Sequence, residues 1–107
     1  MPQRFVICTD SGGGEGYAAT TRERNKITRL LQSKGWRIWH WFEDVWLVVN
    51  PSEERYSTDQ LQLELRTQFI DDRYVLILEV TAGEYSGFGP KKAWPWMRKN
   101  WDDDMPA

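Results

Sequence analysis

The sequence predicts a single α+β domain of 107 residues, and three observations carry this prediction. Apolar runs rich in β-branched and aromatic residues, which are typical of β-strands, occupy 5–9, 36–49 and 74–80. Segments with helical spacing of apolar residues, 21–34 and 58–69, separate those runs. A chain of this length buries enough surface on folding for one hydrophobic core without disulfides.

The first strand is an apolar run that stops at a carboxylate, Asp10. Such a run is typical of a central strand, and it would deliver one acid to the edge of the sheet. The glycine-rich segment 11–16 follows. Its backbone N–H groups suit a phosphate, but it matches no nucleotide-binding fingerprint. We expect a flexible connection there.

Both predicted helices begin with a capping-box pattern, at 20–23 and at 57–60. Gly35 is well placed to end the first helix. The second segment has a rival interpretation, because the leucines of 61–65 also alternate as they would in a strand. The cap signal and the helix-favouring composition decide for a helix.

Two aromatic and β-branched runs, 36–42 and 45–49, are separated by Glu43 and Asp44, which predicts a hairpin. On one face of the first of these strands we expect Trp36, Ile38, His40 and Phe42, and on the other Arg37, Trp39 and Trp41. The resulting order, βαββαβ, is typical of a ferredoxin-like fold, a four-stranded antiparallel sheet with two helices on one face.

The chain contains seven tryptophans, more than one small core is expected to enclose. The other face of the sheet needs a cover, and a tryptophan-rich extension, 83–107, follows the core of about 4–80. Together with Trp39 and Trp41, it supplies that cover either within the chain or across a homodimer. A short helix opened by Pro90 or Pro95 would carry Trp94, Met97 and Trp101 as its apolar stripe.

Charge is nearly balanced, with 14 basic and 16 acidic residues, so the whole chain offers no electrostatic funnel for nucleic acid. No apolar run approaches the ~20 residues that span a bilayer. The single cysteine, Cys8, lies within the first strand and cannot form an internal disulfide. We expect a soluble cytoplasmic protein that does not associate with membranes.

Asp10 could hold a divalent cation such as Mg²⁺, because hard cations prefer carboxylate oxygens and can activate water for phosphodiester attack. One acid is not a complete site, and a second Asp10 from a symmetric partner would be the simplest addition. The alternative is a strand-end aspartate that bonds the backbone of the following turn. His40 is the only histidine, and we expect it to be packed rather than catalytic.

Two basic clusters are candidate nucleic-acid contacts. The first lies on the predicted first helix and contains Arg22, Arg24, Lys26 and Arg29. The second contains Lys91, Lys92 and Arg98, interleaved with tryptophans as in single-strand binders. The alternative for the first cluster is an ordinary solvated helix face. The alternative for the second cluster is that its tryptophans belong to the core.

The strand ending in Asp10, the basic first helix, the hairpin 39–49 and the strand 74–80 resemble the small ferredoxin-like proteins of CRISPR adaptation and their SinR-like relatives. The resemblance covers about residues 4–80. It implies a homodimer with the strand-end acid near its axis; some members are metal-dependent nucleases and others act structurally. By this resemblance Asp10 would be the catalytic and metal-binding residue. The glycine-rich segment and the extension 83–107 depart from the family pattern.

We therefore expect a nucleic-acid-related homodimer that acts, if it is an enzyme, as a metal-dependent endonuclease on DNA or RNA. In that mechanism Asp10 of each subunit would hold the ion. The alternative is a non-catalytic interaction module that binds a protein partner through exposed tryptophans.

Overall fold

The computed structural model describes residues 2–10, 20–68, 74–81 and 85–102. Its elements are β1 (Gln3–Thr9), α1 (Thr21–Ser33), β2 (Arg37–Phe42), β3 (Val45–Asn50), α2 (Thr58–Gln68), β4 (Val75–Val80), α3 (Ala93–Trp96) and the π-helix η1 (Met97–Trp101). The glycine-rich segment lies outside the described residues.

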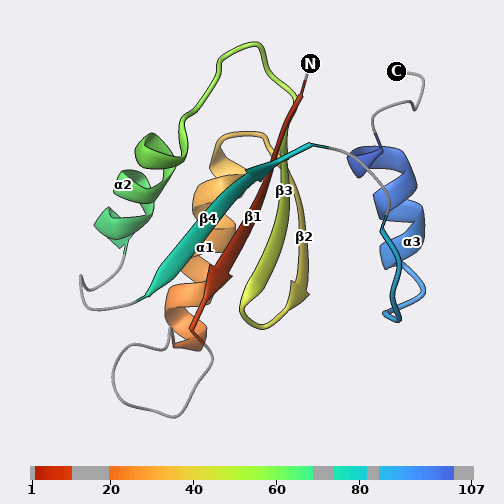
Figure 1. Cartoon of the computed structure of the whole chain (residues 1–107). Coiled ribbons are helices and arrows are strands. Elements are labelled where there is room, and N and C mark those ends of the chain that lie inside the picture. Colours follow the sequence, from red (N-terminus) through yellow and green to blue (C-terminus); the bar gives the residue numbers. More distant parts are fainter. Residues whose placement is uncertain (1, 11–19, 69–73, 82–84, 103–107) are drawn as a thin grey trace.

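The four strands form one antiparallel sheet in the order β2-β3-β1-β4. The predicted α+β class is confirmed, and the arrangement is consistent with a ferredoxin-like kind of fold (Figure 1). β1 is central, as expected from its unbroken apolar run, and its Phe5 and Ile7 are fully buried. β4 and β2 form the two edges of the sheet.

Both predicted capping boxes are present. Thr20 and Glu23 exchange side-chain to backbone hydrogen bonds at the start of α1. Ser57 and Gln60 do the same before α2, where the Ser57 N–H donates to Gln60 Oε1 at 2.8 Å and the Gln60 N–H donates to Ser57 Oγ at 3.0 Å. The helical prediction for the second segment is therefore confirmed over its strand rival.

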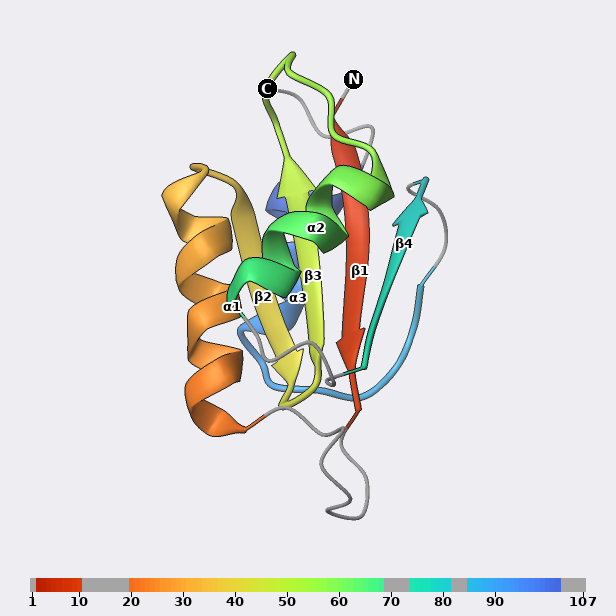
Figure 2. The same cartoon turned by 90° about the vertical axis from the view of Figure 1, so that its left-hand side faces the viewer.

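Helices α1 and α2 cover one face of the sheet (Figure 2). Their apolar stripes enclose the main core with residues of β1 and β3. The enclosed members are Phe5, Ile7, Ile27, Leu31, Trp36, Trp46, Val48, Leu61 and Leu65.

Part of the opposite face, over β2 and β3, is covered from within the chain by α3 and η1, which we call the C-terminal cover (Figure 1). Met97 and Trp101 are buried there against Val49, so the expected apolar stripe packs on the sheet. The Arg4 side chain fixes the end of the cover, because its Nε donates to the Trp101 carbonyl at 2.6 Å. Within the described ranges, no helix has the length and apolar content to cross a bilayer.

The predicted hairpin is present, with Glu43 and Asp44 as its turn, but one facing prediction is wrong. The register shifts between His40 and Phe42, so Phe42 pairs with Val45 on the face of the C-terminal cover rather than lying with His40. A β-bulge inserts one extra residue into a strand and re-aims the residues beside it. As a result, the consecutive residues Trp41 and Phe42 line one pocket.

Candidate functional site

Asp10 lies half-buried at the end of β1, in a shallow hollow beside Tyr74 and Leu76. Its N–H donates to the Tyr74 carbonyl at 3.4 Å, which extends the β1–β4 pairing by one residue. No group of three His, Cys, Asp or Glu side chains suited to a metal is assembled within the described parts of the chain. Among these residues Asp10 therefore belongs to no such group.

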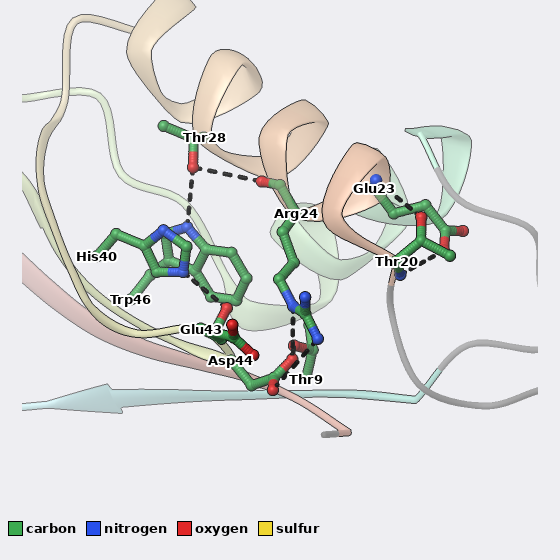
Figure 3. A network of polar contacts seen from close by, with 9 residues as sticks. All are labelled: Thr9, Thr20, Glu23, Arg24, Thr28, His40, Glu43, Asp44 and Trp46. Atoms are coloured by element: carbon green, nitrogen blue, oxygen red, sulfur yellow. Dashed lines mark hydrogen bonds and ion pairs between the residues drawn. The ribbon is translucent and has the colours of Figure 1, made fainter. Parts of the chain in front are cut away.

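Arg24 belongs to an internal polar network rather than to a free basic face (Figure 3). Its Nε donates to the carboxylate of Asp44 at 2.9 Å, and the same oxygen accepts from Thr9 Oγ1 at 2.5 Å. Asp44 is buried, so both partners compensate a carboxylate that has left water. The network ties α1, the hairpin turn and the end of β1 together.

The other cations of the first basic cluster form a stripe along α1. Arg22, Lys26 and Arg29 follow the i, i+4, i+7 spacing of one helix face, and Arg22 and Arg29 are exposed. The structure thus separates Arg24 from its three predicted companions.

His40 packs against a neighbouring ring, as expected, although part of its side chain stays exposed. Its imidazole stacks on Trp46 with 4.4 Å between centroids, and its Nε2 lies 2.7 Å from the Glu43 carbonyl oxygen (Figure 3). The indole N–H of Trp46 donates to Thr28 Oγ1 at 3.0 Å. These contacts join β2, β3 and α1.

The second basic cluster lies at the C-terminal cover, where Lys91, Lys92 and Arg98 are all exposed. Its tryptophans are packed within the chain rather than presented as stacking platforms. Trp94 meets Trp41 edge to face at 5.4 Å, and Trp96 lies against Trp39 at 6.2 Å between ring centroids. Each of the seven tryptophans is buried or half-buried.

The apolar surface is formed by residues that the sequence interpretation did not select. We define the open sheet face as the part of this sheet face that lies beyond the C-terminal cover: Cys8 of β1, Tyr74, and Leu76 and Leu78 of β4. Leu76 is 56% exposed and Leu78 is 46% exposed. The sequence of β4 could have indicated this exposed surface, because large apolar residues lie on both of its faces and such a strand needs a cover on each side.

An aromatic pocket of about 250 Å³ adjoins this face. It is lined by Trp41, Phe42, Val45, Leu47, Tyr85, Ser86, Trp94, Met97 and Trp101. The sheet forms its floor and the C-terminal cover one wall. Val45 pairs with Cys8, and Cys8 pairs with Leu76, so the floor of the pocket continues across β1 into the open sheet face.

The pocket lining contains no charged side chain, whereas the half-buried carboxylate of Asp10 borders the open sheet face beside Tyr74 and Leu76. The indole N–H of Trp41 is buried and meets no acceptor among the described residues. The arrangement is suited to apolar and aromatic recognition.

Comparison with known proteins finds no match: no family model, curated protein or solved structure is significantly similar to this chain. The resemblance to the CRISPR-adaptation proteins stays a prediction.

Proposed function

We propose that this protein is an interaction module that associates with a second copy of itself through the open sheet face. The observation that carries the proposal is the exposure of Leu76 and Leu78, side by side on one face of β4. Contiguous exposed apolar surface of this kind is typical of protein-binding sites. Strand leucines, rather than the exposed tryptophans that the sequence suggested, form the contact.

The position of β4 supports self-association. The only charged side chain of β4, Glu79, pairs with Phe5 on the side of α1 and α2, so the side chains that β4 adds to the open sheet face are uncharged. The aromatic pocket and the exposed side chains of Tyr74, Leu76 and Leu78 carry no charge, so these parts of the surface bring no like charges together when they meet a copy. We further propose that the core is a ferredoxin-like βαββαβ unit, which the order of elements and of strands supports.

The test compares Leu76→Arg with Leu63→Arg in sedimentation equilibrium. Leu63 is the matched control, because it is also 56% exposed but lies on α2, on the other side of the sheet. We expect wild type and Leu63→Arg to dimerise and Leu76→Arg to be monomeric at the same concentration. A wild type that stays monomeric, or a dimer that Leu76→Arg leaves intact, would contradict the proposal.

Nucleic-acid binding is a second candidate, which the cation stripe on α1 favours. Arg22→Gln should weaken binding to labelled DNA or RNA and lower the slope of log affinity against log salt by about 0.7 to 0.9 per lost phosphate contact. Folded Arg24→Gln should bind like wild type, because Arg24 already pairs with Asp44. Equal losses in both variants would count against a phosphate site on this stripe.

Endonuclease activity belongs to this second candidate. Asp10 would hold Mg²⁺ together with ligands from a partner, and the ion would activate water for attack on a phosphodiester. Wild type and Asp10→Ala are incubated with labelled single- and double-stranded DNA and RNA, in magnesium or in chelator. Cleavage that needs both the metal and Asp10 supports the enzyme; cleavage by Asp10→Ala at the wild-type rate excludes this role for Asp10.

A further inference from the structure

We infer that Phe88 of each copy inserts into the aromatic pocket of the other copy, so that the dimer is held by two reciprocal ring insertions. This inference rests on the proposed self-association and names its anchor. It is carried by three observations: the exposure of Phe88, the unfilled aromatic pocket, and the closeness of the two on one surface.

Phe88 is 100% exposed, the largest value among the exposed large hydrophobic residues of the described chain. The next, Phe42, is 61% exposed. Phe88 stands between Gly87 and Gly89, which have no side chains to shield it. A phenyl ring that is exposed to water gains free energy when an interface buries it, and buried aromatic residues are among the strongest anchors of interfaces.

The aromatic pocket has the size and chemistry of a site for one such ring. About 250 Å³ is below the range of pockets for drug-sized ligands and suits a single side chain. Its walls offer the edges and faces of Trp41, Trp94 and Trp101, with which a phenyl ring packs in offset or edge-to-face geometry. Met97 adds a polarizable sulfur that packs well against aromatic rings.

Phe88 and the pocket lie next to each other along the chain segment that leads to α3. Ser86, two residues before Phe88, lines the pocket, and Gly89, one residue after it, lies against the ring of Trp41. Full exposure shows that Phe88 does not occupy the pocket of its own chain.

A projecting residue beside its complementary hollow is the arrangement that a two-fold axis requires. Rotation about an axis between them places each Phe88 at the other pocket, and the contact closes after two copies. The open sheet face continues from the pocket floor, so Leu76 and Leu78 become buried in the same interface. One chain carries both the projecting ring of Phe88 and the pocket that would receive it. The occupant of each pocket is therefore a second copy of the chain.

The test uses two variants, each of which removes one half of the contact. Phe88→Ala keeps the pocket and loses the ring. Ser86→Trp keeps the ring and obstructs the rim of the pocket, and neither change touches a buried residue. Leu63→Ala is the control for loss of an exposed hydrophobic side chain elsewhere. Sedimentation equilibrium and tryptophan fluorescence on dilution report association, and circular dichroism confirms folding.

We expect wild type and Leu63→Ala to dimerise equally, while Phe88→Ala raises the dimer dissociation constant on the order of 100- to 10 000-fold, because two ring burials are lost. Ser86→Trp alone should also be monomeric. An equimolar mixture of Phe88→Ala and Ser86→Trp should form heterodimers with intermediate affinity, because one ring and one matching pocket remain.

Dimerisation of Phe88→Ala at the wild-type constant would overturn the inference, as would a mixture no more associated than its components. A dimer that Leu76→Arg disrupts and Phe88→Ala does not would overturn the ring insertion alone and leave the proposed function standing. A dimer that Phe88→Ala disrupts and Leu76→Arg leaves intact would support the ring insertion and overturn the proposed contact through the open sheet face. A monomeric wild type would overturn both.

Discussion

The backbone of Gly89 lies so close to the indole ring of Trp41 that a β-carbon at position 89 would stand 2.8 Å from Trp41 Cζ2. Real β-carbons do not approach an aromatic carbon this closely, so any other residue forces the segment or the ring to move. The contact fixes the segment before α3 against the end of β2, at the edge of the aromatic pocket.

Gly89→Ala should lower the free energy of unfolding by about 1 to 3 kcal/mol, because either the ring of Trp41 or the backbone at position 89 must move to accept the β-carbon. Urea unfolding followed by tryptophan fluorescence measures the change. Ser86→Ala is the control from the same segment, and it should stay within about 0.5 kcal/mol of wild type. An equal, small effect of both substitutions would show that the segment is not held at Trp41.

Trp46→Phe should be more damaging than Trp41→Phe, although both remove the same atoms. The indole N–H of Trp46 donates to Thr28, and Phe would leave that hydroxyl without its donor; the N–H of Trp41 has no described acceptor to lose. Trp46 is also fully buried, so its truncation leaves a larger cavity. We expect a difference of at least about 1 kcal/mol in urea unfolding.

Thr28→Val separates the hydrogen bond from the cavity in this comparison, because it leaves the ring of Trp46 in place. It removes the acceptor of the indole N–H and, with it, the hydroxyl that donates to the Arg24 carbonyl at 3.3 Å. A cost of about 1 to 3 kcal/mol is expected for a buried donor without a partner. A neutral Thr28→Val would assign the whole difference between the two tryptophans to packing.

Asp44→Ala should destabilise the fold by about 3 kcal/mol or more, because it leaves the nearly buried guanidinium of Arg24 without its counter-charge. Thr9 loses an acceptor at the same time. Thermal and urea unfolding measure the loss, with Glu43→Ala, an exposed residue of the same turn, as the control. Comparable stabilities of the two variants would show that the network does not hold the turn.

Lys34 makes the stability depend on alkaline pH. Burial alone would lower its pKa, but hydrogen bonds to Glu64 and Tyr56, together with their charges, outweigh burial and raise the pKa above the ordinary 10.5. A raised pKa in the folded state stabilises fully below the unfolded pKa, and the contribution disappears as pH rises through the folded pKa.

The free-energy difference between wild type and Lys34→Met should therefore be constant up to about pH 10 and shrink above it. Urea unfolding at several pH values, repeated in a Tyr56→Phe background to remove the phenol that titrates in the same range, measures the difference. A difference that grows with pH would mean that folding lowers the pKa of Lys34 rather than raising it.

Local signals in the sequence were sufficient for most of the fold. The capping boxes at Thr20 and Ser57 and the two-residue turn at Glu43 and Asp44 involve neighbours in the chain, so their geometry follows from residue type and spacing. The central position of β1 follows from its apolar run in the same way.

Features that depend on contacts distant in sequence could not be predicted. The bulge that turns Phe42 toward the C-terminal cover depends on pairing with Val45 and on packing against residues far along the chain. The pairing of Arg24 with Asp44 joins two elements, so helix spacing alone groups Arg24 with Arg22. Whether the tryptophan-rich extension covers its own sheet or a partner's is likewise a question of tertiary packing, and the structure places α3 and η1 on their own sheet.

The two hydrophobic clusters lie on opposite faces of the same strands and share no side chain. Detachment of the C-terminal cover would therefore leave the cluster beneath α1 and α2 intact, which is the condition for local unfolding at a free energy below that of global unfolding. Amide protons of α3 and η1 should exchange with solvent sooner than those of β1. The proposed dimer contact includes Trp94, Met97 and Trp101, so association would slow amide exchange in α3 and η1 more than in β1. The exchange rate of these two helices would then report whether the protein is a monomer or a dimer.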